Sequence, residues 1–259
     1  MVRLLIFCVL FFFFQRLSAQ GDGTVGYTVG VEFKALLNPT VFNLDSVVLI
    51  DSGENFRAVY NYAGGFGFGG IVRVKLTEFW NVETGINYTR RRYDFTITDL
   101  DSVYEGSTEL RVVGYEIPLK ALVYIQMGKK IFMDVALGVS ADFFASDVIS
   151  LDRSFNFRAY KRGSFIKAAV LANVGVEYRT EKDGYFYIGA GFHQILSDIM
   201  VTEVNFYRDN QPGGVQQFIG RQRGLLDGSY FSVDLRYFFP VQKPTRPKVN
   251  RVIPDWKKM

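Results

Sequence analysis

The sequence lacks the residues on which thiol chemistry and most metal binding depend. Its 259 residues include one cysteine, Cys8, and one histidine, His193. No spacing of His, Cys, Asp or Glu matches a metal-binding motif, and no glycine-rich phosphate loop opens a helix. The sequence therefore predicts no cofactor, no metal site and no catalytic residue.

Long apolar runs are missing as well, with one exception at the N-terminus. Arg3 precedes the apolar core Leu4 to Phe14, and the small residues Ser18 and Ala19 follow it. This order is typical of a secretory signal peptide, and the apolar core is too short to serve comfortably as a membrane anchor. We therefore expect residues 1–19 to be removed on export, and Cys8 with them.

An excess of charge of one sign is also lacking. Removing Arg3 and Arg16 lowers the Lys and Arg count from 30 to 28 against 26 acidic residues, so the mature chain carries about +2. This excess is small and scattered, and it argues against a nucleic-acid partner.

What the sequence has in abundance is period-2 alternation. Between Gly114 and Phe143, apolar and polar residues alternate for about ten residues on either side of a turn at residues 126–130. Ten alternating residues are enough for a tilted strand to cross a bilayer. The rest of the chain repeats this unit.

The alternation predicts eight strands joined by connections that are long and short in turn. The expected strands are residues 27–37, 62–76, 80–95, 114–125, 131–143, 164–178, 185–196 and 229–239. The long connections are residues 38–61, 97–109, 144–163 and 198–228. The predicted fold is all-β: an eight-stranded antiparallel up-and-down transmembrane β-barrel over residues 20–240, with long extracellular loops and short periplasmic turns. Residues 241–259 form a basic, Pro-rich tail, and both termini are expected in the periplasm.

Alternation alone does not distinguish a membrane barrel from a soluble lipocalin-like barrel with an apolar interior. Two features favour the outer membrane. Glycines gather on the polar face, which suits a crowded narrow interior better than a solvated surface. Aromatic residues of the apolar face gather near the strand ends, as at lipid interfaces. We therefore expect the apolar face to contact outer-membrane lipid.

The polar face then lines the lumen of the barrel. It carries charged residues of both signs: Glu32, Lys34, Arg73, Lys75, Glu83, Glu116, Lys120, Asp134, Asp142, Lys167, Glu177, Asp234 and Arg236. Because side chains fill the interior of an eight-stranded barrel, we expect an ion network and no water-filled pore. Within the central hairpin, Lys120 is predicted to lie close to Asp134.

The strand from Gly114 to Tyr124, GYEIPLKALVY, resembles the E-I-P-L strand of PorT-like outer-membrane β-barrel proteins, which a Gly-containing strand such as 135–139 follows. The resemblance in layout covers about residues 24–240 and implies a small barrel, and the family supplies no catalytic residues to carry over to this chain. One branch of that family serves type IX protein secretion and gliding. Pro118 cannot donate a ladder hydrogen bond, so we expect a local bulge there.

Three further features are candidates for function. His193, with Ser197 and Asp198 nearby, would be needed for a lipid-modifying enzyme, although its parity places it in the lumen. A possible lipopolysaccharide contact at the outer rim comprises Arg90, Arg91 and Arg92. A possible partner-docking set in the tail comprises Lys243, Arg246, Lys248, Arg251 and Trp256.

Together these features predict a non-enzymatic outer-membrane barrel that anchors or assists an envelope assembly, such as type IX secretion, through its loops and tail. A lipid-modifying enzyme and a narrow channel are the alternatives.

Overall fold

The computed structural model describes residues 26–37, 47–50, 55–77, 80–145, 147–152, 154–160, 164–180, 183–209 and 216–240. Residues 1–19, which were predicted to be a signal peptide, and the tail with Lys243, Arg246, Lys248, Arg251 and Trp256 lie outside them. None of the described residues forms a helix long and apolar enough to span a bilayer.

The described residues form an antiparallel all-β structure. Its strands are β1 (Tyr27–Leu37), β2 (Val47–Ile50), β3 (Phe56–Lys75), β4 (Trp80–Asp99), β5 (Glu105–Gln126), β6 (Ile131–Phe143), β7 (Val148–Leu151), β8 (Phe155–Tyr160), β9 (Ile166–Arg179), β10 (Tyr185–Ile195), β11 (Met200–Asp209), β12 (Gln216–Leu226) and β13 (Tyr230–Phe238).

The eight predicted strands are β1, β3, β4, β5, β6, β9, β10 and β13, and they make a barrel. They pair in the order β1-β13-β10-β9-β6-β5-β4-β3, and β1 also pairs with β3, so the ladder returns to its start. β1 begins and β13 ends at the same end of the barrel, which we call the terminal end. The predicted all-β antiparallel fold is confirmed.

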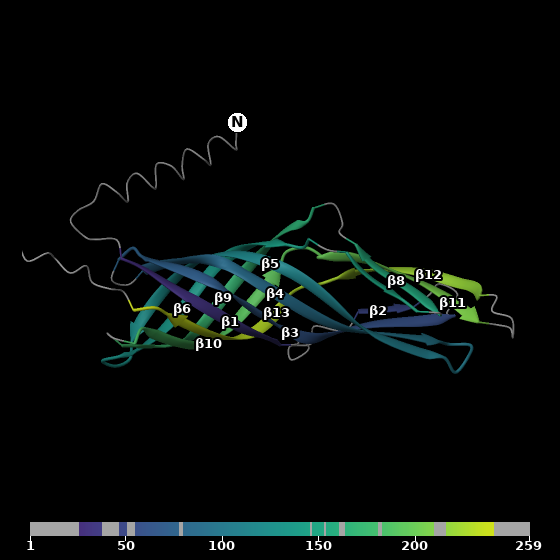
Figure 1. Ribbon diagram of the computed structural model, residues 1–259, viewed down its shortest axis with the longest axis horizontal. Coiled ribbons are helices and arrows are strands. Elements are labelled where there is room, and N and C mark those ends of the chain that lie inside the picture. The colour runs from purple at the N-terminus through teal and green to yellow at the C-terminus, as the bar shows by residue number, and fades with distance from the viewer. Residues whose placement is uncertain are drawn as a thin grey trace, which may run out of the picture.

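The opposite end of the molecule differs from the prediction. Much of the four segments predicted as long loops is β-structure: β3, β4 and β5 continue beyond the barrel, and β2, β7, β8, β11 and β12 are added. β12, β11, β8 and β7 form a second sheet. Figure 1 shows these strands gathered at one end of an elongated molecule, away from β6 and β10. We call this end the extension.

The extension has an apolar core of its own, rich in aromatic side chains. Its buried members include Phe56, Tyr60, Phe95, Phe157 and Phe206. The rings of Tyr60 and Phe95 are 5.1 Å apart, and those of Phe95 and Phe157 are 5.0 Å apart, distances typical of favourable aromatic pairs. Burial of this core is the physical reason why these segments are ordered strands.

A β-bulge in β3 marks the boundary between barrel and extension. The register of β3 against β4 shifts between Tyr62 and Gly64, so Ala63 is an extra residue. Gly64 has φ = +87°, a left-handed conformation that glycine adopts without steric cost. The extra residue changes which face points inward: Tyr62 is buried above the bulge, and Arg73 is buried below it.

Pro118 does not produce the predicted bulge. The register of β5 against β6 runs through the Pro118–Ser140 pair without a shift. On the other side, the β4–β5 ladder omits two positions, between the Thr84–Leu119 and Asn87–Glu116 pairs. The Thr84 hydroxyl donates to the Pro118 carbonyl at 2.8 Å. A side-chain hydrogen bond thus satisfies the backbone carbonyl of Pro118, and the register of β5 against its neighbours does not change.

The distribution of apolar side chains over the barrel is inverted relative to a soluble protein. Exposed residues on the outer face include Leu119 at 54%, Leu137 at 64% and Ile188 at 57%, whereas Glu83 and Asp234 inside are 0% exposed. Such an apolar exterior around a charged interior suits a surface that faces lipid.

Candidate functional site

The charged lumen is the densest set of functional side chains among the described residues. Of the thirteen residues predicted to line it, all but Lys75, which is exposed, and Lys167, which is half-buried, are buried. They come from every barrel strand except β10, and on each strand they lie at inward positions, which recur every second residue. The network has three levels along the barrel axis.

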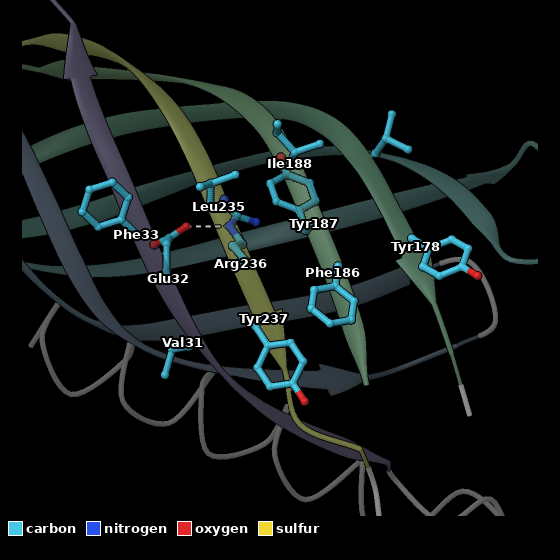
Figure 2. A pocket seen from close by; sticks show the side chains of 11 residues that line it. Val31, Glu32, Phe33, Tyr178, Phe186, Tyr187, Ile188, Leu235, Arg236 and Tyr237 are labelled. Carbon is cyan, nitrogen blue, oxygen red and sulfur yellow. Dashed lines mark hydrogen bonds and ion pairs between the residues drawn. The ribbon is translucent and has the colours of Figure 1, made fainter. Parts of the chain in front are cut away.

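The middle level is organised around Arg236 on β13. Its guanidinium lies 2.5 Å from Glu32 on β1, 3.3 Å from Glu83 on β4 and 3.3 Å from Asp234. Lys120 Nζ approaches Glu83 Oε1 to 2.6 Å. Figure 2 shows Glu32 and Arg236 joined between β1 and β13.

The same wall has an apolar outer surface. A hollow of ≈530 Å³ on the outside of β1, β9, β10 and β13 is bordered by Phe33, Ile188, Leu235 and Tyr237 among others. Figure 2 shows these side chains around the Glu32–Arg236 pair. The wall of the barrel, a single β-sheet, therefore separates the buried ion pairs from the apolar outer surface.

At the terminal end, arginines and aromatic rings fill the lumen. Arg73 bridges Glu83 and Glu177. Its guanidinium lies 3.8 Å from the centre of the Phe238 ring, and that of Arg179 lies 4.1 Å from the Phe132 ring. Such cation–π contacts suit desolvated guanidinium groups, which need many partners.

The level next to the extension is built on Glu116 and Asp142. Arg91 Nη2 donates to Glu116 Oε1 at 3.0 Å, and Lys34 Nζ donates to Glu116 Oε2 at 3.4 Å. The Tyr230 hydroxyl contacts both Glu116 oxygens, at 2.9 and 3.0 Å. Arg91 lies 5.2 Å from the Phe144 ring, and Phe144 belongs to the core of the extension. The aromatic core thus rests directly on the ion network.

Arg91 corrects one of the sequence predictions. It is fully buried and points into the lumen, so it is not available to lipopolysaccharide. Its Nε also donates to the Gly228 carbonyl at 3.1 Å. Arg90 is half-buried and Arg92 is exposed. The Arg90–Arg92 run was predicted to contact lipopolysaccharide at the outer rim, but the β4–β5 ladder continues through it, so the middle arginine faces inward.

The predicted proximity of Lys120 and Asp134 is wrong. The hairpin places Lys120 opposite Gly138 and Tyr124 opposite Asp134. Both charged residues point into the lumen, but four residues along a strand separate them by about 13 Å. The turn between β5 and β6 sets this register.

His193 lies in the lumen, as its parity predicted. It is 2% exposed and stacks on Tyr230, with ring centres 4.5 Å apart and planes at 7°. Ser197 is exposed beyond the end of β10, and Asp198 is half-buried. The three residues therefore occupy different environments.

His193 has other neighbours, which sequence reasoning missed. Its Nε2 lies 3.0 Å from Asp142 Oδ2 and 3.8 Å from Glu116 Oε1. The three residues can each present a ligand atom within 4.8 Å of the others. They come from β5, β6 and β10, so no local spacing signals their convergence. The signal that the sequence did offer is that all three residues have inward parity at one level of the barrel.

Comparison with known proteins agrees with this geometry. Residues 18–200, more than half of the chain, match the outer membrane protein beta-barrel domain. The chain belongs to this family. No curated protein matches the sequence. Outer-membrane localisation follows from the family.

Comparison with solved structures returns proteins that share little sequence with this family member. The outer membrane protein OprG from Pseudomonas aeruginosa is 13% identical, with a TM-score of 0.51 over 84% of this chain and 97% of that chain. The outer membrane protease OmpT from Escherichia coli is 8% identical, with a TM-score of 0.32 over 85% and 100%. An outer membrane channel from Pseudomonas putida F1 is 15% identical, with a TM-score of 0.24 over 85% and 98%. OprG supports the barrel fold alone.

Proposed function

We propose that this protein is a non-enzymatic, non-conducting anchor of the outer membrane that holds an envelope assembly through its extension and its C-terminal tail. The observation that carries the proposal is the interior, where ion pairs fill the barrel and the aromatic core of the extension rests on them. An interior of this kind serves stability and leaves the protruding surfaces to make contacts.

The extension is suited to such contacts. It is a folded β-structure on the same strands as the barrel, so a partner bound there is held rigidly with respect to the membrane. In outer-membrane barrels the longer connections face the cell exterior, and this rule would place the extension outside and both termini in the periplasm. Lipid would surround the apolar band, and Arg90 and Arg92 would contact lipopolysaccharide phosphates at its outer edge.

The resemblance of the Gly114–Tyr124 strand to PorT-like proteins supports protein secretion as the setting. The basic tail would then reach periplasmic components of the assembly. The enzymatic alternative would require His193 to meet a nucleophile, and its buried side chain is separated from the exposed Ser197. The channel alternative would require a continuous aqueous path through the lumen.

Crosslinking and affinity capture from native membranes test the anchoring role. The full-length protein, tagged at the connection between β11 and β12, would be compared with a chain ending at Pro240 and with an Arg221→Glu, Arg223→Glu variant. These arginines are exposed on the extension. We expect envelope proteins that co-purify with the full chain to be lost with the tail or with the charge reversal. Identical recovery with all three forms, or no recovered protein, would contradict the proposal.

A further inference from the structure

Glu116, Asp142 and His193 combine several features of a metal-binding site. All three are buried, at 1%, 0% and 2% exposure. Although Asp142 Oδ2 lies 3.0 Å from His193 Nε2, neither atom has a hydrogen-bond partner, and His193 Nδ1 has none either. Two polar atoms in contact but outside hydrogen-bond geometry leave a buried imidazole and a buried carboxylate oxygen unsatisfied, which is costly.

Each of the three side chains is held by interactions outside the cluster. Ser140 donates to Asp142 Oδ1, while Asp142 Oδ2 faces His193 and also lies 3.7 Å from Arg91 Nη2. Arg91, Lys34 and Tyr230 fix the Glu116 carboxylate, and Tyr230 also orients the His193 ring by stacking. Carboxylates that bind metal ions are typically hydrogen-bonded to surrounding residues in this way.

The spacing suits a small divalent ion. Tetrahedral zinc about 2.0–2.1 Å from nitrogen and oxygen ligands places neighbouring ligand atoms about 3.3 Å apart. The distances from His193 Nε2 to the two carboxylate oxygens, 3.0 and 3.8 Å, lie on either side of this value. A cavity of ≈10 Å³, about the volume of one water molecule, borders His193 on the side of Lys34 and Lys120, and neither carboxylate lines it.

We propose that Glu116, Asp142 and His193 bind one divalent transition-metal ion of the zinc type. One imidazole and two carboxylates favour such an ion over calcium or magnesium, which take oxygen ligands. The positive charges of Arg91 and Lys34 lower the affinity, and Glu32, 3.6 Å from Lys34, partly offsets this. The ion would tie β5, β6 and β10 together across the lumen. This inference does not depend on the anchoring role.

The test uses the full-length protein, unfolded in urea and refolded in detergent micelles with Zn²⁺ present, so that the buried site is accessible during folding. After removal of free metal, elemental analysis measures the bound zinc. We expect about one zinc per chain, at least about tenfold less in His193→Ala, and about tenfold or more weaker binding in Ser140→Ala.

The matched control is Asp134→Asn, which removes another buried lumen carboxylate of β6 whose oxygens also lack hydrogen-bond partners. It should keep its zinc. Circular dichroism checks folding, and if His193→Ala does not fold, the isosteric Asp142→Asn decides in its place. A refolded wild-type protein without zinc, or a folded ligand variant with as much zinc as wild type, would overturn the proposal.

Discussion

Arg236 is the residue on which most ion pairs of the middle level converge. Its guanidinium contacts Glu32, Glu83 and Asp234, and it lies 4.4 Å from the Tyr187 ring. Removing one partner of a buried charged group leaves the remaining charges without compensation, and this loss exceeds the net stabilisation from the intact pair.

We therefore predict that Arg236→Met destabilises the barrel by about 3–5 kcal/mol, because buried carboxylates lose their counter-charge. Urea unfolding in lipid vesicles measures the change. Lys75→Met is the control, since Lys75 has the same lumen parity but is exposed, and its effect should stay within about 0.5 kcal/mol. Equal effects of the two substitutions would contradict the role assigned to the network.

In the extension, Asp99 is a buried charged residue with several polar partners, as Arg236 is in the barrel. Burial raises the pKa of Asp99, but hydrogen bonds from Arg208 and Ser102 outweigh burial and hold the pKa below its ordinary value. Arg208 contacts both Asp99 oxygens, at 2.6 and 2.8 Å. Because the pKa is lower in the folded state, this stabilisation is complete above the unfolded value of about 3.9 and is lost as the pH falls through the folded value.

Asp99→Asn should accordingly lower the free energy of opening of the β4–β5 tip by about 1–2 kcal/mol at pH 7. Amide hydrogen exchange, corrected for intrinsic rates, measures this, and the difference from wild type should shrink as the pH falls below the ordinary Asp pKa and through the lower folded one. Asp101→Asn serves as the control, since Asp101 is largely exposed and makes one 3.2 Å contact with Arg208. A difference that does not change with pH would refute the assignment.

The limits of sequence reasoning at this scale are clear from the lumen residues. Strand parity was enough to place Glu83, Asp134 and Arg236 inside, because alternation fixes the face of each residue. Parity did not reveal which inward residues meet, because contacts across the lumen depend on the stagger of strands that are distant in sequence. The meeting of Glu116, Asp142 and His193 is such a contact.

Among the elements, the strands of the extension were not predicted from the sequence. The eight barrel strands were predicted with correct faces, and β1 with its observed ends. The alternation Phe56, Ala58 and Tyr60 was present in the predicted first loop, but polar residues and turn signals around it favoured a loop. Its continuity with the barrel was hidden by the bulge, which changes the alternating phase at Ala63.

The bulge offers a direct test of how barrel and extension are joined. A Cβ added to Gly64 would lie 2.8 Å from the Leu36 carbonyl oxygen and would force a non-glycine residue into a positive φ. We predict that Gly64→Ala costs about 1–2 kcal/mol from the backbone conformation alone, and more from the close contact. In a time course with added protease, the extension of the Gly64→Ala variant should be cleaved faster than that of the wild type.

Gly70→Ala provides the comparison, because nothing lies within 4 Å of a Cβ added there. Its effect on stability should stay within about 0.5 kcal/mol. If Gly64→Ala also left the extension as resistant to protease as the wild type, the left-handed glycine would not be required at the junction.

For the molecule as a whole, barrel and extension share the strands β3, β4 and β5 but have two kinds of interior. The barrel is filled with ion pairs between charged side chains, and the extension is filled with aromatic and aliphatic side chains. Arg91 joins them, since it binds Glu116 in the lumen and lies 5.1 Å from the ring of Tyr230 in the apolar core. This continuity is the physical basis for the proposal of a non-conducting anchor.

Electrical recording in planar lipid bilayers tests this central claim most directly. Purified full-length protein, with its fold confirmed by circular dichroism, would be inserted and recorded in concentrated salt at both polarities. We predict no stepwise conductance, because side chains occupy the lumen and the aromatic core lies above it. Reproducible single-channel steps from the folded wild-type protein would contradict a filled interior and would make a channel the better account.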